Sequence, residues 1–336
     1  MKISFIIPVY CAAPFIHRCL DSIFALGIPE EQMEIICVDD CSPDNTCEVI
    51  ERIRDERRNG LTGESCIVLL RHEKNKRQGG GSNTAIRYAH GDYAVFMDQD
   101  DEILPYDLLG QIAYMQEHDL DLLLGRVLCD DGKGNRRYWA NVENESEIMS
   151  GPEFFRDRMI NRVGFGTVWM GIYKMELLKR TEPFVEKMIY EDADWCFRCT
   201  YNAKRVQYKP FDMYLYYNNP TSSSHNVSVQ KVEWKVRQSV RMYYWSQQVT
   251  EEVAAVRDAS EFFYTWNMQG LKVLWKFTIA ERSQFYSAFT KEEYAIIQSW
   301  PRTFKEVLLM QYPRLAQVGL AIVSPMLRLA RRMKRT

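Results

Sequence analysis

Residues 95–105 have the sequence VFMDQDDEILP, an apolar run that ends in three carboxylates within four positions. Asp98, Asp100 and Asp101 repel one another when they are crowded together, and such clusters usually belong to solvated surface loops. The run before them, however, is typical of a strand that is buried on both faces of a sheet. The feature to explain is why an acidic cluster directly follows such a strand.

Strand-like and helix-like segments alternate around this stretch through residue 128. Continuous apolar runs predict strands at 3–9, 33–40, 67–71, 93–98 and 120–127. Apolar residues at helical spacing predict helices at 14–27, 42–60, 81–91 and 104–119. Strict alternation of this kind predicts an α/β fold with a mostly parallel central sheet and helices on both faces.

Two of the predicted strands end in carboxylates. Parallel α/β sheets bind ligands at the carboxyl ends of their strands, so Asp39 and Asp40 should share a crevice with the cluster at 98–101. Crowded carboxylates favour a bound cation, and hard oxygen donors favour Mg²⁺ or Mn²⁺. These ions usually combine one or two protein carboxylates with substrate phosphates, which predicts a nucleotide diphosphate in the crevice. The alternative is a solvated acidic loop.

Composition and motifs exclude several other classes of function. The chain has 46% hydrophobic and 26% charged residues and a net charge of -2, which gives no reason to expect nucleic-acid binding. A Rossmann dinucleotide site needs glycines just after the first strand, where this chain has PVYCAAPF. The P-loop motif, GxxxxGK followed by Ser or Thr, does not occur either.

The cysteines and the apolar segments bear on the compartment. The nine cysteines are scattered, which suits reduced thiols in a cytosol, and we interpret Cys196 and Cys199 as two helix residues rather than metal ligands. The N-terminus lacks a signal-peptide pattern, and no stretch approaches the roughly 20 apolar residues of a membrane span. We therefore expect a cytoplasmic protein.

The second half of the chain changes character. Residues 130–228 alternate less clearly and are rich in aromatic residues, and from about 229 the pattern is helical. We expect one domain at 1–228, with a nucleotide-binding half at about 1–128 and an acceptor half at about 129–228. Residues 229–336 are predicted to form a helical appendage.

The C-terminal tail has a distinct charge pattern. Residues 315–327 carry no charge, and five basic residues follow between 328 and 335. This pattern favours an interfacial helix on an anionic membrane, on the inner face of the cell membrane. The alternative is a core-packing helix with a solvated basic end.

Four blocks, at 5–23, 34–46, 75–105 and 190–198, resemble the family 2 glycosyltransferases of the GT-A fold, in order and at similar intervals. The resemblance implies a nucleotide-sugar donor, such as a UDP-sugar, and a divalent cation, Mn²⁺ or Mg²⁺. It departs at Gly81-Ser82-Asn83, where the family often has Ala-Arg-Asn. Lys76 and Arg77 are the candidates to replace the missing guanidinium.

The resemblance also implies roles for individual residues. Residues expected at the nucleotide-sugar are Pro8, Val9, Tyr10, Asp39, Asp40, Asp98 and Gln99. Asp192 matches the catalytic base, although acidic residues also favour a helix first turn. Asp100 matches the metal ligand, and His225 is a second candidate on a polar loop where a histidine is usually solvated.

The acceptor side is assigned less directly. Trp169, Glu191 and Trp195 are candidate acceptor residues, against the alternative that Trp195 belongs to the core. With one carboxylate base and a metal, direct displacement inverts the anomeric centre. The sequence therefore predicts an inverting glycosyltransferase that transfers sugar to a hydroxyl of a glycan or lipid-linked glycan in surface polysaccharide synthesis. The alternative is a catalytically silent nucleotide-sugar-binding or scaffold protein.

Overall fold

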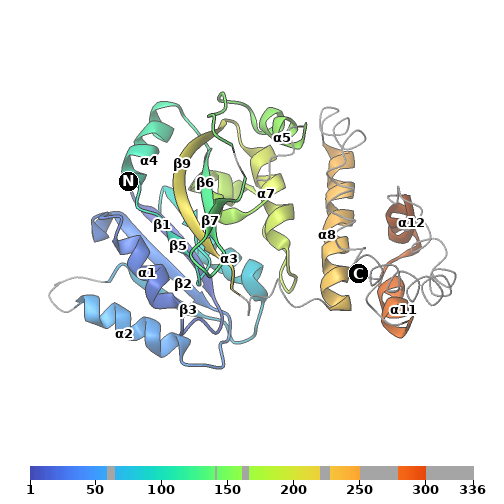
Figure 1. Cartoon of the computed structure of the whole chain (residues 1–336), viewed down its shortest axis with the longest axis horizontal. Helices are drawn as coiled ribbons and strands as arrows, with labels where there is room; N and C mark the ends of the chain where they lie inside the picture. Colours follow the sequence, from blue (N-terminus) through green and yellow to red (C-terminus); the bar gives the residue numbers. More distant parts are fainter. Residues whose placement is uncertain (59–64, 141, 161–165, 220–227, 250–278, 300–336) are drawn as a thin grey trace, which may run out of the picture. The chain divides into compact units, whose positions relative to one another are not determined.

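The computed structural model describes residues 1–58, 65–140, 142–160, 166–219, 228–249 and 279–299 (Figure 1). The chain divides into two compact units, one at 1–225 with 250–256 and the other at 226–249 with 257–336. His225 and the basic tail lie outside the described residues. In the part described, no helix is both long enough and apolar enough to cross a membrane.

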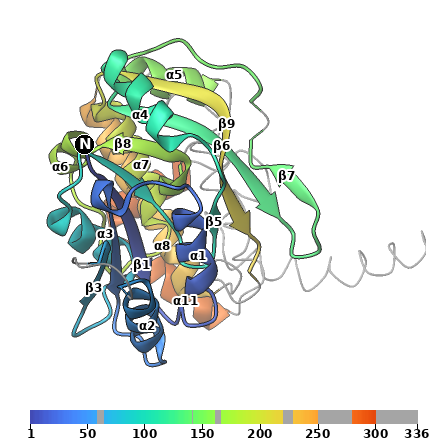
Figure 2. The ribbon, with the colours of Figure 1, turned by 90° about the vertical axis from the view of Figure 1, so that its left-hand side faces the viewer.

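The first unit is built on one mixed sheet with the strand order β3-β2-β1-β4-β8-β6-β9-β5, and β7 pairs with β6. The strands are β1 (Ile3–Val9), β2 (Met33–Asp39), β3 (Ile67–Arg71), β4 (Tyr93–Phe96), β5 (Glu102–Ile103), β6 (Leu122–Asp130), β7 (Arg136–Tyr138), β8 (Gly171–Lys174) and β9 (Val206–Tyr217). Figure 2 shows β6 and β7 extending away from the rest of this sheet as a hairpin.

Helices connect these strands. They are α1 (Ile16–Phe24), α2 (Thr46–Arg58), α3 (Arg77–Tyr88), α4 (Leu108–Glu117), α5 (Gly151–Ile160), α6 (Met175–Arg180) and α7 (Glu191–Asn202), with short 3-10 turns η1 (Glu30–Gln32) and η2 (Val168–Met170). The apolar side of α1 is fully buried through Ile16, Cys19, Leu20 and Ile23, which is the helical spacing seen in the sequence. The cysteines at 196 and 199 are buried residues of α7, as predicted.

The predicted α/β fold is confirmed, with one difference in strand placement. Strands β3, β2, β1 and β4 are parallel neighbours, as the apolar runs predict. The strand predicted at 120–127 does not continue this parallel set, because β8 lies between β4 and β6 and is antiparallel to both. β8 has only four residues, and a run that short gives no clear periodicity in the sequence.

The parallel pairing brings the ends of three strands to one edge. In the register of β1 and β2, Val9 lies opposite Asp39, and the N–H of Asp40 donates to the carbonyl of Val9 at 2.9 Å. The N–H of Met97 donates to the carbonyl of Ile6 on the other side of β1. The segments that follow β1, β2 and β4 therefore leave the sheet together.

The second unit is described by its three helices, α8 (Val229–Gln248), α11 (Ile279–Ser287) and α12 (Lys291–Ser299). They pack through a small apolar cluster that contains Val236, Val240, Phe285 and Ile297. The side chain of Ser228 caps α8 by accepting from the N–H of Lys231. The helical pattern predicted from about residue 229 is thus present where the structure describes it.

Asn83 ties α3 to the segment before α7. Its Nδ2 donates to the carbonyl of Phe184 and its Oδ1 accepts from the N–H of Phe184, both at 2.9 Å and both buried. We expect Asn83→Ala to lower the free energy of unfolding by about 1–3 kcal/mol, because both Phe184 groups lose their partner. Chemical denaturation measures this. Arg87→Ala, on the exposed side of the same helix, is the control, and equal stabilities of the two variants would contradict the prediction.

Candidate active site

The acidic loop after β4 is held against the loop after β1. Gln99 bonds the backbone of Tyr10 twice: its Oε1 accepts from the N–H at 2.6 Å and its Nε2 donates to the carbonyl at 2.9 Å. The backbone carbonyl of Asp100 accepts from the guanidinium of Arg18 on α1. The structure therefore gives the side chain of Gln99 a positioning role within the protein.

Asp39, at the end of β2, is buried but only partly satisfied. Its Oδ2 accepts from the N–H of Ser42 at 3.2 Å and lies 3.7 Å from Nε of Arg71. Its Oδ1 is buried and has no hydrogen-bond partner among the described residues. An unpaired buried carboxylate oxygen is costly, so this atom is well suited to accept an N–H from a ligand.

Asp40 braces the loop that leads into α3. Its Oδ1 accepts from the N–H of Lys76 at 2.7 Å, its Oδ2 accepts from the N–H of Arg77 at 2.6 Å, and Nδ1 of His72 lies 2.8 Å from Oδ1. Arg77 has φ 64, a left-handed conformation that these bonds help to hold. The next residue, Gln78, donates to Oδ1 of Asp98 at 2.5 Å, so Asp40 supports the acidic loop through this segment.

Close packing explains the glycines of α3. A Cβ on Gly81 would lie 2.8 Å from Cβ of Pro8, and one on Gly79 would lie 2.9 Å from Cγ of Glu191. Both distances are too short for a side chain to fit without movement. The departure from the Ala-Arg-Asn pattern at Gly81 thus lets α3 approach β1. Of the predicted nucleotide turn, Val9 is buried and Tyr10 is exposed.

Burial and mutual repulsion dominate the electrostatics of the acidic loop. Burial raises the pKa of Asp98 to about 8, and the charges of Asp100 and Asp192 add to the rise. Burial also raises the pKa of Asp101 to about 9, with the charges of Asp98 and Asp100 next in size. Desolvation and like charge both disfavour the ionised form, so the loop favours added positive charge.

Asp101 accepts hydrogen bonds from two tyrosines, a structural role that the sequence did not indicate. Its Oδ2 accepts from the hydroxyl of Tyr214 at 2.9 Å and its Oδ1 accepts from the N–H of Tyr217 at 2.8 Å. The Tyr214 hydroxyl also accepts from the N–H of Asp98. Both tyrosines lie on β9, far away in sequence, and no local pattern around residue 101 could indicate them.

The start of α7 brings two more carboxylates to the site. Glu191 is buried, and burial raises its pKa to about 8, with the charge of Asp192 next. Asp192 is partly exposed; burial raises its pKa to about 6, and the N–H of Ala193, bonded to Oδ1 at 2.9 Å, works against the rise. Because the charge of Asp192 also raises the pKa of Asp98, the start of α7 lies close enough to the acidic loop to interact with it electrostatically.

The two indoles predicted for the acceptor lie in different surroundings. The Trp169 ring stacks on Tyr214 at 4.9 Å, and its side chain lowers the pKa of Asp98, so it adjoins the acidic loop. Trp195 is 1% exposed and stacks on Phe184 at 4.2 Å. The Trp195 ring therefore has no open face for a sugar, and its surroundings favour the core interpretation.

The donor set of the acidic loop suits a hard divalent cation. Asp98 and Asp100 are partly exposed and offer only carboxylate oxygens, and Oδ2 of Asp100 accepts from Nδ2 of Asn219 at 2.9 Å. Within the described ranges, no group of three or more His, Cys, Asp and Glu side chains is arranged as a metal site. The residues thus fit an ion that also takes phosphate oxygens from its ligand.

Comparison with known proteins agrees with this geometry. The family described as Glycosyl transferase family 2 matches residues 4–181. An uncharacterised glycosyltransferase, YibD of Escherichia coli, is 28% identical over 231 residues, which cover 66% of this chain and 63% of YibD. The poly(ribitol-phosphate) beta-N-acetylglucosaminyltransferase TarS of Staphylococcus aureus is 26% identical over 64% of this chain and 35% of TarS. The chain thus spans less than two thirds of these relatives.

A solved structure shows the same fold. The crystal structure of TarS residues 1–349 in complex with UDP-GlcNAc superposes with a TM-score of 0.65 at 22% identity. The superposition covers 95% of this chain and 89% of that one. The GT-A fold expected from the sequence is therefore confirmed.

The bracing role of Asp40 can be separated from ligand binding. In Asp40→Asn, one oxygen becomes an NH₂ group that faces a backbone N–H, so we expect a loss of about 1–3 kcal/mol in the free energy of unfolding. Chemical denaturation tests this, with the exposed Glu48→Gln of α2 as control. Unchanged stability together with lost UDP affinity would instead make Asp40 a direct nucleotide contact.

Proposed function

This chain belongs to glycosyl transferase family 2, and from that membership we propose that it is an inverting, metal-dependent enzyme. It transfers the sugar of a UDP-sugar to a hydroxyl of a glycan or lipid-linked glycan, in the synthesis of a cell-surface polysaccharide. The observation that carries the proposal is the meeting of Asp192 with the acidic loop at Asp98. The proposed proton acceptor then lies within electrostatic reach of the carboxylates proposed to hold the cation.

The donor side of the proposal rests on Asp39. Its buried Oδ1 has no hydrogen-bond partner among the described residues, and in this proposal it accepts an N–H from a nucleobase, as uracil presents. Tyr10 is exposed beside this edge and is available to the nucleotide. Asp98 and Asp100 would hold the cation, which supplies positive charge to the leaving diphosphate.

The acceptor side rests on the different environments of two neighbouring carboxylates. With a pKa near 8, Glu191 keeps its proton at neutral pH, whereas Asp192, with a pKa near 6, is mostly ionised. Environments that separate two pKa values in this way assign the base to the group of lower pKa. Asp192 then takes the proton from the acceptor hydroxyl as that oxygen attacks the anomeric carbon from the face opposite the leaving group.

The place of action is part of the proposal. Residues 313–336, with the charge-free run and the five basic residues, would hold the enzyme on the anionic inner face of the cell membrane. That location suits an acceptor carried on a lipid.

The base assignment predicts a pH profile. Asp192→Asn should lower kcat by about 10²–10⁴-fold and leave UDP affinity unchanged, because the amide cannot accept the proton. In the unmodified chain, kcat/KM should fall as the pH drops through about 6, since protonation of Asp192 in the free enzyme removes the base. Steady-state turnover of UDP-sugars and UDP calorimetry measure both, with exposed Glu176→Gln as control. A pH profile that is unchanged in Asp192→Asn would assign the base elsewhere.

The metal assignment predicts a change at Asp100. Asp100→Asn should lose most Mn²⁺-dependent turnover and shift its Mn²⁺ requirement to higher concentration, because a neutral amide is a poorer ligand for a hard cation. The variant should stay folded, since its side chain can still accept from Asn219. Turnover against Mn²⁺ concentration is the measurement, and a wild-type Mn²⁺ curve in the variant would remove Asp100 from the metal site.

A further inference from the structure

A hollow of about 640 Å³ lies beside the β6–β7 hairpin, outside the residues assigned so far. It is lined by Arg136, Arg137, Tyr138, Trp139, Tyr216 and Asn218. We propose that this hollow binds a pyranose unit of the acceptor glycan, stacked on Trp139. The inference rests on the proposed glycosyltransferase function and names the acceptor subsite of that reaction.

Trp139 is the first reason. Its indole is 47% exposed, although burial of an indole is among the larger apolar gains available to a protein. Nearly perpendicular contacts with Trp169, at 5.5 Å and 89°, and with Tyr216, at 5.8 Å and 74°, hold the ring in place. A large aromatic ring that is both fixed and exposed is a platform for a ligand.

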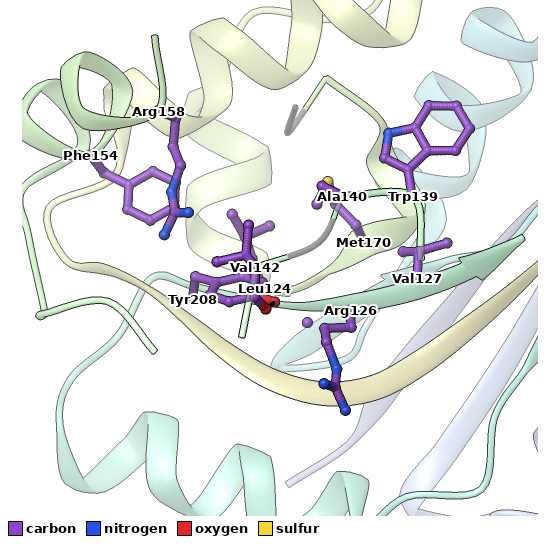
Figure 3. Close-up of a pocket in the computed structure, with 11 residues that line it drawn as sticks. Leu124, Arg126, Val127, Trp139, Ala140, Val142, Phe154, Arg158, Met170 and Tyr208 are labelled. Atoms are coloured by element: carbon purple, nitrogen blue, oxygen red, sulfur yellow. Dashed lines mark hydrogen bonds between the residues drawn. The ribbon is translucent and has the colours of Figure 1, made fainter. Parts of the chain in front are cut away.

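The other side of Trp139 offers no competing site. A smaller cavity of about 20 Å³ also borders Trp139 and has room for about one water molecule. Figure 3 shows this cavity with Met170 and Ala140 next to Trp139, while Arg126 points to the opposite face of the sheet. This cavity is far smaller than the hollow, so the hollow is the side of Trp139 with room for a sugar.

The polar groups of the hollow favour a neutral sugar over a polyanion. Asp130 lies 3.3 Å from Nε of Arg136 and offsets its charge. Asp131 is occupied within the turn, where it accepts from the N–H of Lys133 and from Nδ2 of Asn135. Arg137 is the lining cation for which the described residues provide no ion pair.

These groups match the two sides of a pyranose ring. The C–H face of such a ring is apolar and flat enough to stack on an indole, while its hydroxyls project around the edge. The guanidinium of Arg137 can bond hydroxyls there. A single uncompensated cation gives little affinity for a chain of phosphates, which would need several.

β9 connects the hollow with the acidic loop. Tyr216 and Asn218 line the hollow, whereas Tyr217 and Asn219 bond Asp101 and Asp100, respectively. Trp169 adds a second connection, since it contacts Trp139 and also stacks on Tyr214, whose hydroxyl bonds the acidic loop. A glycan held on Trp139 thus runs along the same strand toward the proposed reaction centre.

The test uses the full chain and neutral trisaccharides as probes, namely chitotriose and maltotriose. Saturation-transfer NMR should detect binding of at least one of them. Trp139→Ala should weaken that binding about tenfold, and Trp139→Phe should weaken it less, because a smaller aromatic face remains. Tyr88→Ala removes an exposed aromatic ring of α3 away from the hollow and should bind like the wild type.

The proposal is overturned if Trp139→Ala binds the trisaccharides as well as the wild type does, or if the wild type binds neither trisaccharide. It is also overturned if glycerol phosphate displaces the sugar from the wild type and no longer does so in Arg137→Gln. The last result would indicate an anionic acceptor. Calorimetry with UDP and Mn²⁺ on the same proteins measures binding at the donor site separately. Absence of UDP binding alongside Trp139-dependent sugar binding would contradict the proposed function and leave the subsite in place.

Discussion

The crowding of carboxylates at the carboxyl end of β4 is the constraint on which the rest of the N-terminal unit depends. Burial and like charge raise the pKa of both Asp98 and Asp101, so the loop is stable only where other parts of the chain hold it. β9 supplies the hydroxyl of Tyr214 and the N–H of Tyr217, and the segment before α3 supplies Gln78. Elements far apart in sequence thus converge on one short loop.

The sequence predicts the half of the fold in which neighbouring segments also become neighbouring strands. The runs at β1 and β2 are long and apolar because both faces of these strands are buried, and that property is visible locally. The order β4-β8-β6-β9-β5 depends on pairing between distant segments, which is antiparallel except between β6 and β9. β8 has four residues and β5 has two, so neither carries a pattern that could show its partner.

The candidate site, like the fold, can be predicted from the sequence only in part. The strand ends place Asp39 and Asp98 at one edge, and topology alone predicts this. The exposure of the indoles of Trp139, Trp169 and Trp195 cannot be predicted from the sequence, because helical or strand spacing does not indicate how much of a side chain is buried. Trp195 is 1% exposed, Trp169 is 4% exposed and Trp139 is 47% exposed. The exposed one, Trp139, follows a three-residue strand whose pairing with β6 only the fold reveals.

The two carboxylates at the start of α7 show how packing can divide the roles of adjacent, chemically similar groups. Both lie in the first turn of the helix, where the backbone N–H groups favour negative charge. Glu191 packs against α3 so closely that only glycine fits at position 79, and burial keeps its proton in place near neutral pH. Asp192 keeps some exposure to solvent and the N–H of Ala193 as a donor, so it ionises at lower pH. The glycine of α3 is therefore tied to the proposed chemistry, because the close approach it permits helps to bury Glu191 and leaves Asp192 as the carboxylate that ionises at lower pH.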